Sequence, residues 1–237
     1  MLSALFGLIT TAETVLLGMV IALRRRRPDW ALTLLILVLI GLIWDNTVIA
    51  IGATVGEGAT LETLSFPRYA AHGVLVPLLI MVGVGLARRH GVRFFTGRAT
   101  PAVFGAVTIA LIAVGIRIDI VALDLEPTRY AGTLRYTNAA AHGPPIPAVA
   151  TIVILIAIGA ALLAYSRRPW LLTGAIAMFA AAAAAVTAFW IGNVGELLLI
   201  LGIWLTATHR TGPHRQAPDH HGDQAPTSPR SRASPRT

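Results

Sequence analysis

The chain has 237 residues, of which 55% are hydrophobic and only 13% are charged, and its mean hydropathy is +0.71. These values are typical of polytopic membrane proteins and not of soluble ones. The net charge of +8 does not indicate nucleic acid binding, because the arginines form short clusters between apolar stretches, as membrane topology requires. Cysteine and lysine are absent, which excludes disulfides, thiolate metal sites and a retinal Schiff base.

Seven stretches are apolar enough to cross a bilayer, since a transmembrane helix needs about 20 such residues. We predict an all-α polytopic fold, residues 1–210, with seven transmembrane helices at 2–23, 30–53, 70–87, 101–121, 147–165, 170–190 and 191–208. The last two stretches are nearly contiguous. We divide them at Ile191-Gly192-Asn193 because a single helix through both would be about 58 Å long, and Gly and Asn favour turns.

The arginines predict the orientation in the membrane. Alternate connections carry only Arg68, Arg117, Arg129 and Arg135, while the other connections and the polar tail carry all the rest. The positive-inside rule then places the N-terminus outside and the C-terminus in the cytoplasm. The first stretch lacks a preceding basic segment, so we expect an uncleaved anchor and a multi-pass protein of the cell membrane.

Three segments outside the spans have distinct compositions. The outward connections are Thr54–Tyr69 and the longer Ile116–Ile146, whose mixed charges fit either an ordered lid or a solvated surface. Residues 211–237 contain hardly an apolar residue, so we predict a disordered cytoplasmic tail. The pair His220-His221 within it is interpreted as incidental rather than as a metal site.

Polar side chains gather in the outer halves of the second, third and seventh stretches. A charged group facing lipid costs at least about 2.5 to 3.5 kcal/mol, so these residues should face the bundle interior or a wet cavity. A carboxyl withdrawn from water favours its protonated form, which can donate a proton. The candidate catalytic residues are Asp45, His72 and Glu196, and the candidate substrate-binding residues are Trp44, Asn46, Glu57, Arg68, His142 and Asn193.

Each candidate also has a structural interpretation. The Asp45-Asn46 pair could clamp two helices through hydrogen bonds, and Arg68 could extend to lipid headgroups. Glu57 could be a surface residue of its loop. Glu13, near the bilayer centre, could be a protonated carboxyl hydrogen-bonded to a neighbouring helix.

Five motifs carry a resemblance to a known family: DNxxIAxG at 45–52, GEG at 56–58, PRYxxH at 67–72, RYAGTLRYTNAAAHGPPIP at 129–147 and GNxGELLL at 192–199. With them, the chain resembles a family of seven-span bacterial membrane proteins, some of which are labelled phospholipid phosphatases. The lipid phosphatase motifs KxxxxxxRP, PSGH and SRxxxxxHxxxD do not occur in this sequence, which argues against that chemistry.

A second resemblance is to small integral-membrane terpene cyclases, which have seven spans and essential acids in the second and seventh. Trp44-Asp45 and Glu196 stand at corresponding places, although that family has Glu after the Trp and a downstream Tyr. Seven-span zinc hydrolases resembling ceramidases have a paired HxxxH in the last span, which is missing here. His72 and His142 with Asp45 or Glu196 could still form an unusual metal site.

These observations favour an enzyme that acts on a membrane lipid or isoprenoid by acid catalysis, as a proton-initiated terpene cyclase does. Asp45 or Glu196 would donate the proton, His72 and Asn46 would orient the donor, and Arg68 would meet an anionic headgroup. No cofactor or metal is expected. The alternatives are a non-enzymatic lipid-binding or transport protein and, third, a metal-dependent lipid hydrolase.

Overall fold

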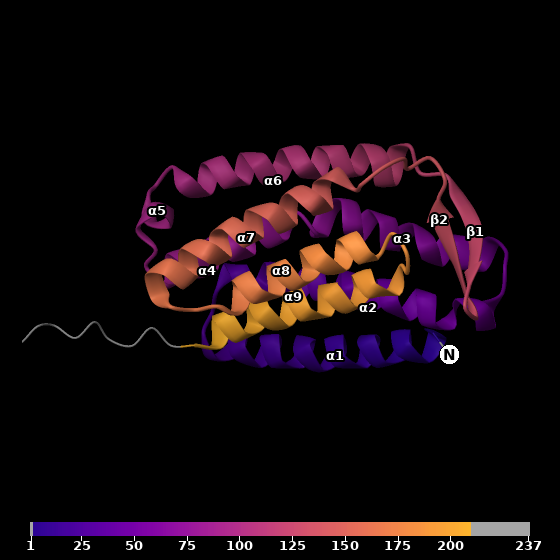
Figure 1. Cartoon of the computed structure of the whole chain (residues 1–237), viewed down its shortest axis with the longest axis horizontal. Coiled ribbons are helices and arrows are strands. Elements are labelled where there is room, and N and C mark those ends of the chain that lie inside the picture. The colour runs from indigo at the N-terminus through magenta and orange to yellow at the C-terminus, as the bar shows by residue number, and fades with distance from the viewer. Residues whose placement is uncertain (1, 210–237) are drawn as a thin grey trace, which may run out of the picture.

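The computed structural model describes residues 2–209, which form an elongated helical bundle with a β-hairpin at one end (Figure 1). The predicted tail at residues 211–237, with its His220-His221 pair, lies outside the described residues. The elements are α1 (Leu2–Arg26), α2 (Trp30–Val55), α3 (Ala59–Leu75), α4 (Leu78–Arg89), α5 (Arg93–Thr96), α6 (Thr100–Ile116), the π-helical turn η1 (Arg117–Val121), β1 (Leu125–Tyr130), β2 (Thr133–Asn138), α7 (Ile146–Ser166), α8 (Trp170–Ala184) and α9 (Trp190–Thr208).

Five helices within residues 2–209 are long and apolar enough to cross a membrane: α1, α2, α7, α9 and the unit of α6 with η1. α3 and α4 together form a sixth candidate that bends by 42°. The bend falls at Val76-Pro77, where proline lacks the N–H that a continuous helix would need. α8 is apolar but has only 15 residues. The chain therefore has the mostly helical architecture of a polytopic membrane protein, with five or six helices apolar enough to cross a membrane. The prediction of an all-α fold is wrong at residues 125–138, where β1 and β2 form a hairpin.

The third helical segment begins earlier than the sequence predicts. Thr54–Tyr69 was expected to be a loop, but α3 already starts at Ala59. Leu61 and Ser65 are buried and lie four residues apart on one helical face. This buried face stabilises the helix, although the polar residues and Pro67 of the segment are typical of a loop.

The turn between α8 and α9 also differs from the prediction. It lies at residues 185–189, and Gly192 and Asn193 are inside α9. The Asn193 amide donates hydrogen bonds to two side chains of α2. These tertiary partners outweigh the local preference of Gly and Asn for turns.

The connection at 116–146 contains an ordered hairpin. β1 and β2 pair antiparallel, with Tyr130 opposite Thr133, around a two-residue turn. Ala131 and Gly132 both have positive φ, 45° and 83°, as a type I′ turn requires. Leu134 and Tyr136 of β2 pack on α2 and α3 in a small apolar cluster, so the hairpin covers this end of the bundle.

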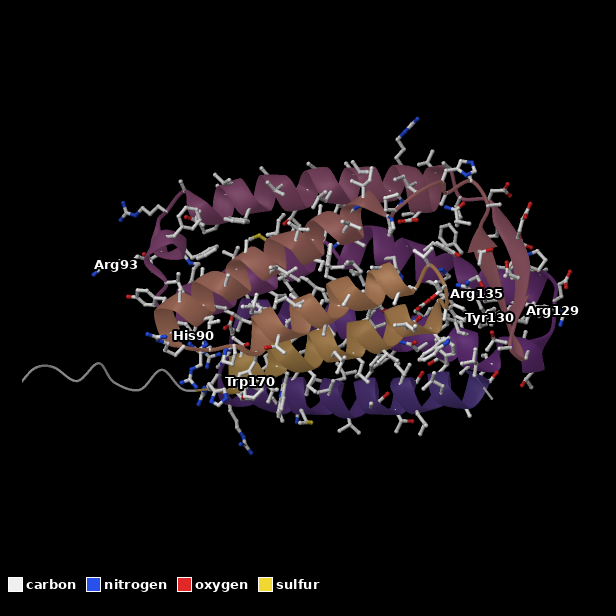
Figure 2. All side chains as sticks on the ribbon, viewed as in Figure 1. His90, Arg93, Arg129, Tyr130, Arg135 and Trp170 are labelled. Carbon is white, nitrogen blue, oxygen red and sulfur yellow. The ribbon has the colours of Figure 1, made fainter. Side chains whose placement is uncertain are left out.

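The two ends of the bundle differ in charge. We call the end covered by β1 and β2 the hairpin end, and the opposite end the arginine end. In Figure 2, Arg93, His90 and Trp170 lie at the arginine end, whereas Arg129, Tyr130 and Arg135 lie at the hairpin end. Helix α1 starts at the hairpin end and α9 finishes at the arginine end (Figure 1). The main apolar core lies between α2, α4, α7, α8 and α9. By contrast, only 11% of the apolar 18-residue stretch of α6–η1 is buried.

Candidate functional site

Asp45 is the centre of a buried polar network between the helices. Its side chain is only 4% exposed, and Oδ1 accepts a hydrogen bond from Nε of Arg68 at 2.6 Å. Oδ2 accepts from the Asn193 amide at 3.2 Å. Both oxygens are therefore occupied by donors, one of them a guanidinium. These are the contacts of an ionised carboxylate.

The network extends from Asp45 to α1. The same Asn193 nitrogen donates to Oδ1 of Asn46 at 3.1 Å. The amide of Asn46 in turn donates to Glu13, with its nitrogen 3.1 and 3.0 Å from the two carboxyl oxygens. Asn46 and Glu13 are fully buried. This part of the site is closed on all sides and joins α1, α2 and α9.

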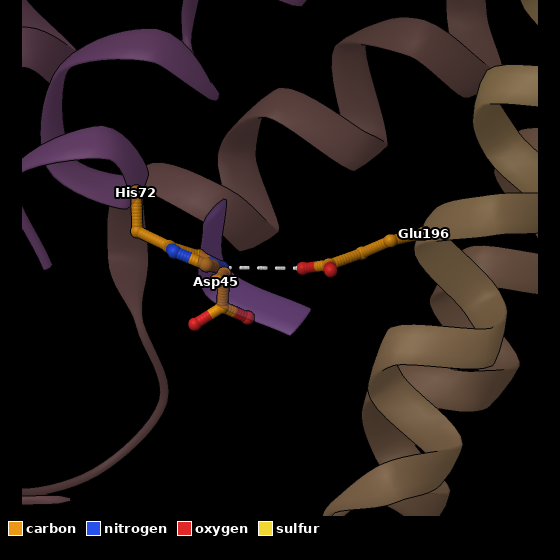
Figure 3. A group of neighbouring side chains, drawn as sticks. All are labelled: Asp45, His72 and Glu196. Carbon is orange, nitrogen blue, oxygen red and sulfur yellow. Dashed lines mark hydrogen bonds and ion pairs between the residues drawn. The ribbon is translucent and has the colours of Figure 1, made fainter. Parts of the chain in front are cut away.

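His72 and Glu196 form a second part of the site, facing each other from α3 and α9 (Figure 3). Nδ1 of His72 lies 3.0 Å from the carbonyl oxygen of Arg68. A carbonyl only accepts, so Nδ1 carries a hydrogen and donates it. Nε2 then faces Oε1 of Glu196 at 3.3 Å, and a hydrogen bond between these atoms needs one proton, on the ring or on the carboxyl. The pair can therefore hold and release one proton.

The second oxygen of Glu196, Oε2, is buried and has no hydrogen-bond partner within residues 2–209. Glu196 and His72 line a small cavity between α2, α7, α8 and α9 and the bend joining α3 to α4. The rest of the lining is apolar except for Thr151, whose hydroxyl donates to the carbonyl of Pro147 at 2.7 Å. An unpaired carboxyl oxygen thus borders an almost entirely apolar space.

The same side chains could hold a metal ion. One ligand atom each from Asp45, His72 and Glu196 lie within 4.8 Å of one another. Two carboxylates and an imidazole suit zinc or a non-haem divalent metal, and a metal-binding His commonly donates its other ring N–H to a carbonyl, as His72 does. However, Asp45 would have to exchange a hydrogen bond from Arg68 or Asn193 for the metal.

The hairpin covers the site and contacts it directly. Arg68 Nη1 donates to the carbonyl oxygen of Tyr136 at 3.4 Å, and the Tyr69 hydroxyl donates to the same oxygen at 3.0 Å. The backbone N–H of Asn138 donates to the Tyr69 hydroxyl, and Gly58 donates its N–H to the hydroxyl of Tyr136 at 3.1 Å. Residues of the GEG and PRYxxH motifs therefore hold β2 against the bundle through hydrogen bonds.

The structure brings six of the nine predicted site residues together: Asp45, Asn46, Arg68, His72, Asn193 and Glu196.

The other three predicted site residues lie elsewhere. Glu57 is on the surface and pairs with Arg129, His142 is exposed in the connection between β2 and α7, and the indole N–H of Trp44 donates to the carbonyl of Leu64. No metal-compatible group within residues 2–209 contains His142.

Sequence reasoning missed Arg135 as a member of the site. It was counted only as one of several charges in the predicted lid. Arg135 is placed beside Arg68 and Tyr69 by the hairpin, and burial, with the neighbouring charge of Arg68, lowers its pKa from the ordinary value. The RYAGTLRYTN motif contains it, but no spacing rule indicated which strand face would meet the bundle.

No protein-family model matches this chain, and comparison with curated proteins finds no match.

Proposed function

We propose that the protein is a membrane-embedded enzyme that transfers a proton to a lipid or isoprenoid substrate and cyclises it, as terpene cyclases do. The observation that carries the proposal is the His72–Glu196 pair, which borders an otherwise apolar cavity and has one unpaired carboxyl oxygen.

Glu196, rather than Asp45, is the proton donor in this proposal. Both oxygens of Asp45 accept hydrogen bonds, one from a guanidinium, so an added proton on Asp45 would have to displace one of these donors. Glu196 has a free oxygen and a neighbour, His72, that shares its proton. Asp45 then serves to hold Arg68 and Asn193 in place.

The proposed reaction is an isomerisation in which atoms balance. Glu196 protonates the terminal double bond, or the oxygen of an epoxide, of a folded polyprenyl chain, and a carbocation forms. A second double bond attacks it and forms a carbon–carbon bond. A carbon adjacent to the final cation then loses a proton to the carboxylate or to Nε2 of His72, which restores the donor. Water must be excluded to protect the cation, and the apolar lining provides this.

In this proposal the protein crosses the cell membrane seven times, with α8 as a short sixth span. α8 lies closely against α9, where Gly174 faces Gly202. The arginine end lies in the cytoplasm, following the positive-inside rule, and the hairpin end faces outward. The site then lies in the outer half of the membrane, where a lipid can enter between helices.

The experiment uses purified protein in detergent with linear prenyl chains that end in a double bond or an epoxide. Wild-type protein should convert one of them into a cyclic product of unchanged mass. Glu196→Gln should reduce turnover by at least about 100-fold, the lower range of general acid catalysis. The matched control is Glu62→Gln, because Glu62 is exposed on α3. Equal turnover in Glu196→Gln and wild type would contradict the proposal. If wild-type protein binds the prenyl substrates but does not convert them, a lipid-binding protein is favoured.

A metal-dependent lipid hydrolase is a second candidate, and the close approach of Asp45, His72 and Glu196 favours it. Metal analysis of protein purified without chelators tests it. About one zinc or iron per chain, lost in His72→Ala, would support this candidate over proton-initiated cyclisation.

A further inference from the structure

Arg135 is a cation without a counter-charge. Among residues 2–209, no carboxylate lies within ion-pair distance of its guanidinium, and its Nε is buried without a hydrogen-bond partner. A charge that is partly withdrawn from water and unpaired is costly for a protein to keep. A residue of this kind is typical of a binding site whose ligand supplies the missing charge.

The side chain of Arg135 is held in place by aromatic rings. Its Cζ lies 3.7 Å from the centroid of the Phe189 ring. Phe189 itself stacks on Phe6 and meets Tyr130 edge to face, with both pairs of centroids 5.5 Å apart. The cation–π contact fixes the plane of the guanidinium but uses none of its five N–H donors. The donors remain available to an oxyanion.

Arg135, Arg68 and Asp45 together carry one more positive than negative charge. Arg68 is close enough to affect its titration, as are Asp45 and Tyr69. Asp45 already pairs with Arg68, so two guanidinium groups share one carboxylate. The His72–Glu196 pair is neutral overall whether its proton is on the ring or on the carboxyl. One external negative charge would balance these three side chains.

Arg68 connects this cationic region to the apolar cavity. It lies one helical turn from His72 on α3, and its carbonyl oxygen accepts the hydrogen bond from Nδ1 of His72. The cavity begins at His72 and Glu196 and extends among apolar side chains. Cation and cavity are thus arranged along the bundle in the order of an amphiphile's headgroup and tail.

We propose that Arg135, together with Arg68, binds the phosphate headgroup of an anionic amphiphile whose apolar tail occupies the cavity. This rests on the proposed function for the position of the tail, and it names the substrate class as a lipid or prenyl phosphate. The planar fork of arginine matches phosphate oxygens with two parallel hydrogen bonds. Phe189 and the hairpin determine where that fork points.

The test is the binding of dodecyl phosphate to purified protein in a neutral detergent, measured by calorimetry. Arg135→Gln should weaken binding by about tenfold or more, since charge-assisted hydrogen bonds are lost. Arg129→Gln is the matched control, because Arg129 lies on the neighbouring strand, is 69% exposed and pairs with Glu57. Its affinity for dodecyl phosphate should equal that of wild type.

Two further ligands identify the source of the anion. Dodecanol should bind to wild type more weakly than dodecyl phosphate does. Its affinity for Arg135→Gln should equal its affinity for wild type. Inorganic phosphate alone should bind far more weakly than dodecyl phosphate. If inorganic phosphate binds as tightly, the site is one for a free anion and the amphiphile proposal is wrong.

The thermal stability of Arg135→Gln distinguishes a binding role of Arg135 from a structural one. Without ligand, Arg135→Gln should change the melting temperature little, because removing an unpaired charge offsets the loss of the cation–π contact with Phe189. A lower melting temperature with unchanged affinity for dodecyl phosphate would overturn the proposal. The binding measurement involves no turnover, so a failure of the proposed catalysis would leave this result intact.

Discussion

At the residue scale, the partners of each carboxyl group decide the chemistry available to it. Asp45 has both oxygens engaged by Arg68 and Asn193. Glu196 has one oxygen near His72 and one without a partner. In the proposed function the two acids therefore have different roles, the first fixing neighbours and the second exchanging a proton.

Asp45→Asn tests the first role. The substitution preserves shape but leaves Arg68 as an unpaired charge among the helices, which typically costs about 3 to 5 kcal/mol. We expect the free energy of unfolding in detergent to fall by that amount. The control is Glu57→Gln, which breaks an exposed ion pair and should cost less than about 1 kcal/mol. An Asp45→Asn protein with unchanged stability and lost turnover would instead identify Asp45 as the acid.

Sequence alone was sufficient to find Asp45, His72 and Glu196, because a titratable residue inside an apolar stretch is unusual. It could not assign their partners, which come from α3 and α9, far apart in the chain. Nor could it select Arg135 from the other charges of its segment. What distinguishes Arg135 is that no carboxylate within residues 2–209 pairs with it, and that depends on how the hairpin docks.

At the scale of elements, Gly52 explains how the hairpin reaches the site. A Cβ atom at this position would collide with the carbonyl oxygen of Leu134 on β2. The last glycine of the DNxxIAxG motif therefore permits the strand to lie directly on α2. Through this contact the carbonyl of Tyr136 reaches Arg68 and Tyr69.

Gly52→Ala should displace β2 from the bundle and expose the hairpin. We expect proteolysis between residues 122 and 145 to become at least several-fold faster, while the helices remain assembled. Gly18→Ala is the matched control, since nothing lies within 4 Å of a Cβ there; alanine in this helix should be neutral or slightly stabilising. Unchanged proteolysis of Gly52→Ala would show that the hairpin does not depend on this close contact.

The element boundaries were predicted least well where tertiary contacts override local preference. The polar residues before Pro67 suggested a loop, but Leu61 packs against the hairpin cluster and extends α3 to Ala59. Gly192 and Asn193 suggested a turn, but Asn193 is held by α2. Both errors involve residues whose partners belong to other elements.

At the scale of the whole molecule, composition and hydropathy were sufficient to predict a polytopic helical membrane protein. The charge difference between the two ends leads to the proposed orientation. Because the chain has no cysteine, Arg129→Cys and Arg93→Cys each introduce a single label site at opposite ends (Figure 2). In right-side-out vesicles a membrane-impermeant maleimide should label only Arg129→Cys. Labelling of Arg93→Cys instead would reverse the orientation.

The most direct test of the proton-transfer proposal is the cyclisation reaction run in deuterium oxide. With a linear chain that ends in a double bond, and if Glu196 delivers a proton taken from solvent, each molecule of cyclic product should carry one deuterium at the carbon that was protonated. Glu196→Gln should form no such product, and Glu62→Gln should match wild type. A cyclic product without deuterium, or a deuterated one formed equally by Glu196→Gln, would contradict the account.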